Sequence, residues 1–172
     1  MNENILGALT DKQAITEVLH RYCRGIDRGD AELVNSVYHE DATDDHGIWK
    51  GPGISFAAWM LPQLALIPCM HAVTNILIDL RGDIAFSEAY CLAFSAGSAI
   101  NQENSEGNNT VMCRFVDRFE RRNGEWKIAD RKVLFDVTRR HKPELESGIQ
   151  GPGLTWGRKD HDDLSYRRTK DT

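Results

Sequence analysis

The sequence predicts an α+β domain in which N-terminal helices pack against a curved antiparallel sheet. Two observations and the size of the chain support this prediction. Apolar residues recur at helical spacing in the first third of the chain, and from His71 onward they alternate at a period of two. The chain has 172 residues, of which 41% are hydrophobic, so it can build one domain with a sizeable core. We expect a single domain over residues 1–140 and an irregular tail over residues 141–172, which packs near the mouth of a pocket or at a subunit interface.

The first helix is predicted to begin near "TDKQ" at residues 10–13, which has the form of a capping box. Apolar residues then follow at helical spacing from Ile15 to Ile26. Gly29 can end this helix in the left-handed conformation, and Asp30 can cap a second, short helix directly after it. These segments together predict a helical hairpin.

The next segment, "HEDATDDHGIWKGPG" at residues 39–53, predicts a turn, a short strand and a Gly-Pro-Gly loop. A third helix is predicted over "ISFAAWMLPQLALI" at residues 54–67. Because proline lacks the amide hydrogen that a helix interior needs, Pro62 must lie in the first turns of this helix or kink it.

Two β-hairpins are predicted in the second half of the chain. Strands over residues 71–80 and 84–94 are joined by a turn at "RGD", and their apolar residues alternate as a sheet requires. Strands over residues 110–122 and 125–140 are joined by "NG", which is a strong signal for a two-residue turn. We therefore expect four long antiparallel strands.

Composition excludes several kinds of partner. The net charge of -5 comes from interspersed signs, so the chain has no basic surface for nucleic acid or an anionic membrane. No apolar run approaches the roughly 20 residues of a membrane span, and the polar N-terminus does not resemble a signal peptide. We expect a cytoplasmic protein in which the four widely spaced cysteines are reduced core residues: Cys23, Cys69, Cys91 and Cys113.

Two charged residues interrupt apolar patterns. Asp27 follows Cys23 by four residues and flanks the apolar stripe of the first helix, where a carboxylate is costly unless a partner compensates it. Arg131 lies among apolar residues on one face of the last strand and needs an acid or an anionic substrate group, and Asp27 is the expected acid. The alternatives are a surface role for Asp27 at the helix end and an edge position from which Arg131 reaches water.

His71 stands where the third helix gives way to the first long strand. Its imidazole can abstract a proton if an acid holds its other nitrogen, although a structural histidine is the alternative. A second polar group is formed by Asp44, Asp45 and His46, where alternation sends Asp45 to one side and the other two to the opposite side. Asp44, His46 and His71 are metal-ligand types without a recognised ligand spacing, so no metal is expected.

Aromatic and long apolar side chains provide candidates for the wall of a cavity, with a place in the core as the alternative. The expected substrate-binding residues are Tyr38, Asp45, His46, Trp49, Trp59, Met60 and Phe135.

Several segments together resemble the SnoaL-like branch of the nuclear transport factor 2-like superfamily. They are "LTDKQAITEVLHRYCRGIDRGD", "SVYHEDATDDHGIWKG", "MHAVTN" and "RFVDRFERRNGEWKIADRKVLFD", and the likeness spans roughly residues 9–140. The resemblance implies a conical fold, in which three N-terminal helices pack in a strongly curved antiparallel sheet that encloses one apolar pocket. The site pattern is most similar to that of hexachlorocyclohexane dehydrochlorinase and scytalone dehydratase, which remove a proton with an Asp-His pair and no cofactor.

This resemblance carries over to particular residues. The catalytic aspartate, histidine and arginine of the dehydrochlorinase fall on Asp27 in "GID", His71 in "HAVTN" and Arg131 in "GEWKIADR". Its lysine five residues before the aspartate is Tyr22 here, which disfavours chloride as the leaving group and suits a hydroxyl-bearing or phenolic substrate. By resemblance, Asp27 orients His71, His71 takes the proton, Arg131 anchors Asp27 or stabilises negative charge, and Tyr22 donates to the leaving oxygen.

The expected function is a cofactor-independent lyase, either a dehydratase or a retro-aldol enzyme, acting on a small aromatic or polycyclic substrate. Isomerisation is compatible with the same residues. The alternatives from other classes are the small (beta) subunit of an aromatic-ring-hydroxylating dioxygenase and a non-catalytic module that binds a small ligand. By analogy with the family, we expect a homodimer or homotrimer formed through the open face of the sheet.

Overall fold

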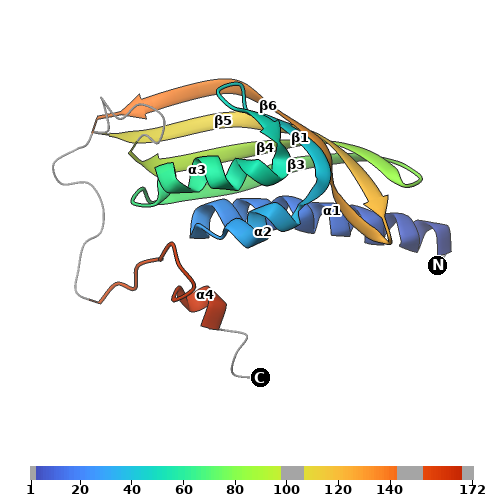
Figure 1. The fold of residues 1–172 in the computed structure, drawn as a ribbon, viewed down its shortest axis with the longest axis horizontal. Helices are drawn as coiled ribbons and strands as arrows, with labels where there is room; N and C mark the ends of the chain where they lie inside the picture. The colour runs from blue at the N-terminus through green and yellow to red at the C-terminus, as the bar shows by residue number, and fades with distance from the viewer. Residues whose placement is uncertain (1–2, 98–106, 143–152, 168–172) are drawn as a thin grey trace.

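The computed structural model describes residues 3–97, 107–142 and 153–167, and the parts of the expected tail at 143–152 and 168–172 lie outside these ranges. Helices and strands follow the chain in the order shown in Figure 1: α1 (Glu3–Arg28), α2 (Ala31–Ser36), β1 (Tyr38–Asp45), β2 (Lys50–Pro52), a 3-10 turn (Gly53–Ser55), α3 (Phe56–Leu64), β3 (Cys69–Arg81), β4 (Ile84–Ala96), β5 (Asn108–Arg122), β6 (Glu125–His141) and α4 (Leu164–Arg167). Among the described helices, none is long and apolar enough to cross a membrane.

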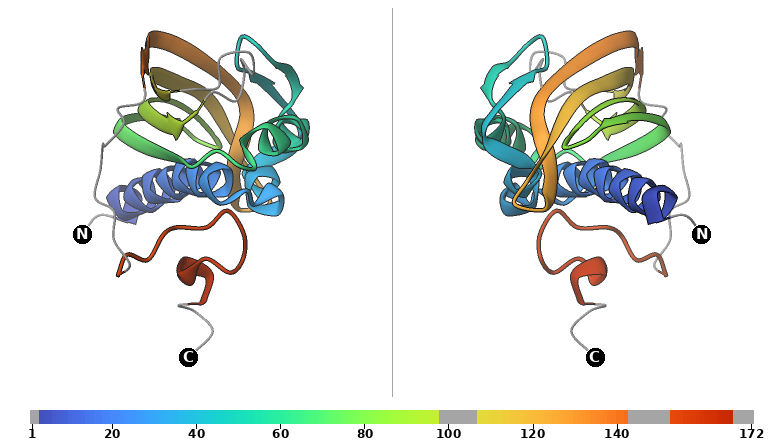
Figure 2. Two further views of the ribbon diagram at one scale, coloured as in Figure 1. Left: turned by 90° about the vertical axis from the view of Figure 1, so that its left-hand side faces the viewer. Right: turned by 90° about the vertical axis from the view of Figure 1, so that its right-hand side faces the viewer.

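One sheet carries the described strands, in the order β2-β1-β6-β5-β4-β3. Neighbouring strands are antiparallel except β1 and β6, which pair in parallel. Figure 2 shows the sheet arching over α1, with α2 and α3 along one side of the arch. The predicted α+β architecture of N-terminal helices in a strongly curved sheet is confirmed.

Helix α1 begins earlier than the capping box predicted. Thr10 lies inside the helix, and its hydroxyl donates to the Leu6 carbonyl 3.0 Å away, one turn back along the chain. A threonine in a helix interior commonly makes this bond, so Thr10 is not the N-cap that the capping box predicted. The other end follows the prediction: Gly29 has a φ of 69°, and the Asp30 carboxylate accepts a hydrogen bond of 2.9 Å from the Leu33 amide.

Two further boundaries differ from expectation. β1 begins at Tyr38 and includes His39, where a turn had been predicted to start, because the segment gains a parallel partner in β6. Pro62 lies near the C-terminal end of α3 rather than in its first turns, and the helix ends two residues later, before the predicted limit. Since proline cannot donate to the preceding turn, it weakens this end of the helix.

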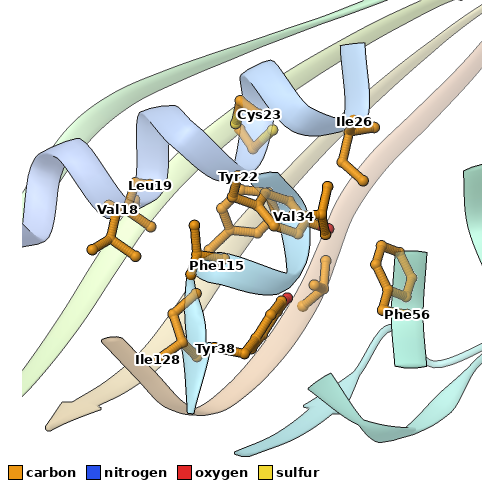
Figure 3. Packing of buried hydrophobic residues seen from close by; sticks show 14 of the residues in the cluster. Val18, Leu19, Tyr22, Cys23, Ile26, Val34, Tyr38, Phe56, Phe115 and Ile128 are labelled. Atoms are coloured by element: carbon orange, nitrogen blue, oxygen red, sulfur yellow. The ribbon is translucent and has the colours of Figure 1, made fainter. Parts of the chain in front are cut away.

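The inner face of β4 carries small side chains. Ala85, Ser87, Ala89 and Cys91 are buried, whereas the larger Phe86 and Tyr90 at the alternating positions remain about 40% exposed. Small residues on the inner face leave room for α1, whose Cys23 reaches Cys91. Figure 3 shows the core that results, in which residues of α1 such as Tyr22 meet Phe115 of β5 and Phe56 of α3.

A β-bulge changes the face assignment in β6. Strict alternation placed Trp126 and Ile128 opposite to Arg131 and Val133, but all four are buried. The register shifts between the pairs Arg118–Asp130 and Phe119–Ile128, so that Ala129 is an extra residue. Such a bulge reverses the alternation, which brings both sets to the inner face.

The tail segment 153–167 lies on the side of α1 that faces away from the sheet (Figure 2). The Tyr166 hydroxyl donates to Asp30 at 2.8 Å, and the Arg24 guanidinium covers the Tyr166 ring at 4.6 Å. The Lys159 ammonium group approaches within 3.0 Å of the Cys69 sulfur, at the beginning of β3. The tail therefore touches the end of α1 and the first residue of β3.

Candidate active site

A cavity of about 460 Å³ lies between α1, α3 and the inner face of the sheet. Its walls are mainly apolar and aromatic, with few polar groups, as is typical of a site for a small organic molecule. The lining residues with side chains suited to acid–base chemistry are His71, Tyr22 and His46. Among the lining residues are Tyr22, Ile26, His46, Phe56, Trp59, Met60, Cys69, His71, Phe115 and Phe135.

Asp27 and His71 form a hydrogen-bonded pair at this cavity. The Oδ1 atom of Asp27 lies 2.7 Å from the Nδ1 atom of His71, and Oδ2 accepts a bond of 3.0 Å from the His71 amide. Both oxygens of one carboxylate thus hold one residue, which fixes the imidazole at the start of β3. Because Nδ1 faces Asp27, a deprotonated ring offers its lone pair to a ligand through Nε2.

The charge of Asp27 changes the acidity of His71. Burial lowers the pKa of His71, but its hydrogen bonds to Asp27 and Cys69 outweigh burial and raise the pKa from 6.5 to about 9. A raised pKa means that the imidazolium form predominates at neutral pH. The deprotonated ring is correspondingly a strong base.

Cys69 and Lys159 lie next to the Asp27–His71 pair. The Cys69 sulfur lies 3.6 Å from Asp27 Oδ1 and 3.0 Å from the Lys159 ammonium nitrogen. Among the described residues, Asp27, Cys69 and His71 bring potential metal donors within 4.8 Å of one another. An ammonium group beside the sulfur and a histidine nitrogen already bonded to Asp27 both disfavour a cation there. The set considered from the sequence, Asp44, His46 and His71, is split between two separate hydrogen-bonded pairs.

A second histidine–carboxylate pair, Asp44 and His46, contacts Tyr22. The Nδ1 atom of His46 lies 2.5 Å from Asp44 Oδ1, and its Nε2 atom lies 3.1 Å from the Tyr22 hydroxyl oxygen. The Tyr38 hydroxyl donates to the other Asp44 oxygen at 2.5 Å. Asp44 is almost fully buried, whereas Tyr22 and His46 line the cavity.

The local sequence explains this arrangement. Alternation along β1 puts Asp44 and His46 on the side opposite to Asp45, as predicted, and the structure shows that this side faces inward. The chain then reverses in a short turn in which the His46 amide donates to the Trp49 carbonyl. Gly53 stands against the Tyr38 ring, where a β-carbon would approach a ring carbon to 2.4 Å. The glycine is therefore needed for Tyr38 to reach Asp44.

The partner of Arg131 is Asp117, and the prediction of Asp27 was wrong. Arg131 Nε and Nη2 donate to the two oxygens of Asp117 at 2.8 and 2.7 Å, and both side chains are fully buried. The two residues are directly opposite each other on β5 and β6, so strand register decides the pairing. Burial disfavours the charged guanidinium, but Asp117 outweighs it and raises the pKa of Arg131 well above its ordinary value.

Arg131 nevertheless contacts two residues that line the cavity, Tyr22 and Phe115. Its guanidinium carbon lies 4.2 Å from the ring centroids of both Tyr22 and Phe115. A cation held against an aromatic face is attracted by the ring electrons. Arg131 thus places a buried positive charge next to Tyr22 without lining the cavity.

The remaining predicted residues divide into two groups. Trp59, Met60 and Phe135 line the cavity together with His46. Asp45, by contrast, faces outward, where its carboxylate accepts from the Gly47 amide and pairs with Lys50 at 2.8 Å. Trp49 packs against Phe56 and Trp59, and Tyr38 lies behind Asp44, so neither belongs to the lining.

No catalytic role was inferred from the sequence for four residues that lie near the site. Asp44 shares a strand face with His46, and alternation alone was a sufficient signal for pairing them. Cys69 precedes His71 by two residues on β3, so it shares the same face. Asp117 required the strand register, and Lys159 required the path of the tail, which the sequence does not encode in a recognisable pattern.

Two of three comparisons with known proteins give matches, a family profile and solved structures. No curated protein matches the sequence. A type 2 hexachlorocyclohexane dehydrochlorinase (LinA) is 17% identical, with a TM-score of 0.71 over 87% of this chain and 99% of that one. A LinA structure is 20% identical, with a TM-score of 0.69 over 86% of this chain and 98% of that one. A protein from Novosphingobium aromaticivorans, provisionally named a scytalone dehydratase, is 16% identical, with a TM-score of 0.67 over 87% and 97% of the two chains.

At these identities, the solved structures establish a shared architecture. The family is shown by the sequence itself, because the SnoaL-like domain profile matches residues 7–132, which is most of the chain and contains both histidine–carboxylate pairs. The chain belongs to the SnoaL-like domain family.

Proposed function

We propose that this protein is a cofactor-independent lyase that expels an oxygen-containing group from a small aromatic substrate. The observation that carries the proposal is the 2.7 Å contact between Asp27 and His71, with His71 on the wall of an apolar cavity. In this proposal, His71 Nε2 takes a proton from the substrate, while Asp27 holds the ring and stabilises the imidazolium that forms. Tyr22 donates to the oxygen at which negative charge develops.

Two further observations support an elimination. Burial raises the pKa of Tyr22 well above its ordinary value, against the opposing effect of Arg131, so Tyr22 keeps its proton and serves as a donor. The names of the structural neighbours, a dehydrochlorinase and a dehydratase, describe the loss of a small acid or of water. The cavity volume of about 460 Å³ suits a substrate with one or two rings.

The aldol of benzaldehyde and acetone is a suitable first probe, because its two breakdown routes give different products. Dehydration gives benzalacetone, and retro-aldol cleavage gives benzaldehyde and acetone. We expect the purified protein to accelerate one of these routes, with and without a chelator, since the proposed chemistry needs no metal. Product analysis by chromatography then separates dehydratase from retro-aldol activity.

The matched variants decide whether the proposed site is responsible. His71→Gln and Asp27→Asn should reduce turnover strongly, whereas Asp79→Asn, an exposed carboxylate on the same strand as His71, should not. Equal turnover in all four proteins would contradict the proposal. If a probe shown by calorimetry to bind in the cavity is left unchanged by the wild-type protein, the non-catalytic binding module becomes the better explanation.

A further inference from the structure

We propose that Asp44 and His46 form a proton relay that reprotonates Tyr22 while Tyr22 protonates the departing oxygen of the substrate. This inference rests on the proposed function, in which His71 serves the other half of the reaction. It makes Asp44 and His46 positioning residues that act through Tyr22. It also specifies the substrate class as β-hydroxycarbonyl compounds, which lose their oxygen as water.

The relay is a continuous hydrogen-bonded chain from the core to the cavity. Asp44 lies at the buried end and accepts from Tyr38 and from His46 Nδ1, each at 2.5 Å. His46 Nε2 lies 3.1 Å from the Tyr22 hydroxyl oxygen at the cavity end. The His46 ring is also stacked on Phe56, with ring centroids 4.1 Å apart, which limits its rotation.

This geometry fixes which nitrogen exchanges a proton. Asp44 receives two donors and remains an acceptor, so the hydrogen on His46 Nδ1 stays directed at it. The proton on Nε2 is the one that changes. When Nε2 carries a hydrogen, it donates to the Tyr22 oxygen, which leaves the Tyr22 hydroxyl hydrogen free to point at a ligand in the cavity.

The elimination then balances in protons and electrons. His71 Nε2 takes a proton from the carbon next to the substrate carbonyl, and the electron pair of that bond forms the new double bond. The carbon–oxygen bond breaks, and the departing oxygen receives the Tyr22 proton while Tyr22 receives the Nε2 proton of His46. His71 ends protonated and His46 ends neutral, so one proton passes back through solvent before the next turnover.

The surroundings of Tyr22 favour this transfer. Its oxygen carries partial negative charge while one proton leaves and the next arrives. The Arg131 guanidinium, 4.2 Å from the centroid of the Tyr22 ring, offsets this charge within the buried site. Asp44, in turn, holds His46 at Nδ1, so that the Nε2 atom that supplies the proton stays directed at Tyr22.

Two reactions separate the relay from the base. Exchange of the α-hydrogens of benzylacetone in deuterium oxide needs only the base, whereas dehydration of the benzaldehyde–acetone aldol needs both halves. The ratio of dehydration to exchange should fall on the order of 100-fold in His46→Gln and in Asp44→Asn. His39→Gln is the matched control, because His39 lies on β1 outside the cavity lining and bonds the Glu120 carbonyl at 3.0 Å. Its ratio should equal that of the wild type.

Leaving-group dependence provides the sharpest readout. A β-(para-nitrophenoxy) ketone releases a phenoxide that needs no proton, so its elimination should survive in the relay variants at a rate close to that of exchange. A structural defect would instead reduce all three reactions together, and that result would overturn the relay. An unchanged ratio in both relay variants would also overturn it. Loss of exchange in His71→Gln with an intact ratio in the relay variants would leave the proposed function standing and remove only this inference.

A double variant covers the case in which a relay variant folds poorly. Tyr22→Phe keeps the ring in contact with Arg131 and Phe115 but removes the hydroxyl that joins His46 to the cavity. Its ratio should fall as in His46→Gln, and adding His46→Gln to Tyr22→Phe should lower the ratio no further, because both changes break one chain. Multiplicative losses would show that the two residues act independently and would overturn the relay.

Discussion

The carboxylate of Asp27 holds His71 at two points, the ring nitrogen at 2.7 Å and the backbone amide at 3.0 Å. One residue at the end of α1 thus fixes both the position and the protonation of a residue 44 positions later in the chain. A carboxylate that only finished the helix would not need both oxygens for one partner.

Replacing Asp27 by asparagine removes the charge and keeps the shape of the side chain. We expect kcat for the aldol probe to fall by roughly 100- to 10,000-fold, because a misoriented and less basic imidazole loses most of the contribution of a general base. The pKa of His71, followed by nuclear magnetic resonance, should fall from about 9 toward its ordinary value. A variant with normal kcat and an unchanged pKa for His71 would contradict the assignment.

Activity should rise with pH. The proposed base is the deprotonated form of His71, whose pKa is about 9, so only a small fraction is active at neutral pH. We expect kcat/KM for exchange of the benzylacetone α-hydrogens, which needs only this base, to increase through pH 7 and 8 and to level off above about 9. In Asp27→Asn the inflection should move to lower pH. A wild-type profile that falls over this range would show that protonated His71 is the active form.

Folding stability should change over the same range in the opposite direction. The pKa of His71 rises from 6.5 in the unfolded chain to about 9 in the folded protein, so protonation stabilises the folded state. This contribution is fully present below pH 6.5 and is lost as the pH rises through about 9. The difference in unfolding free energy between wild type and His71→Gln, measured with urea at several pH values, should shrink accordingly. A difference that grows with pH would contradict the raised pKa.

The buried pair of Arg131 and Asp117 should carry a large share of stability. Removing one partner leaves an uncompensated buried charge, so Arg131→Met and Asp117→Leu should each cost about 3–5 kcal/mol in urea denaturation. The double variant should recover much of this loss, since no buried charge remains. If the double variant is as unstable as the sum of the single ones, the two residues are not paired.

Independence of Arg131 from Asp27 is tested by a separate double-variant cycle. Arg131 bonds Asp117 and Asp27 bonds His71, with no bonding partner in common among the described contacts. The effects of Arg131→Met and Asp27→Asn on unfolding free energy should therefore add within about 0.5 kcal/mol. A larger coupling would restore the original prediction that Arg131 anchors Asp27.

The sequence predicted those parts of the site that depend on local pattern and on the family motif. Asp27 stands at the edge of an apolar helical stripe, and His71 opens a strand, so their roles could be inferred before their contact was known. Arg131 was placed correctly among apolar neighbours, but its partner depended on the register of β5 and β6. Register and the bulge at Ala129 arise from pairing between distant strands, which a single sequence does not display.

The hydrogen-bonded chain of Asp44, His46 and Tyr22 also depends on contacts between distant segments, which the sequence alone did not predict. Alternation turned Asp44 and His46 to one side, yet nothing in the sequence indicated that this side faces Tyr22 of α1. The tail gave no periodic pattern, so the approach of Lys159 to Cys69 could not be predicted.

Abstraction of a carbon-bound proton by His71 is most directly measured by hydrogen exchange without any leaving group. Benzylacetone, incubated with the protein in deuterium oxide, should lose its α-hydrogen signals at a rate that depends on enzyme concentration. The rate should fall on the order of 100-fold or more in His71→Gln and remain at the wild-type level in Asp79→Asn. Exchange that proceeds equally fast in His71→Gln would show that another group takes the proton, and the central role given to the Asp27–His71 pair would be wrong.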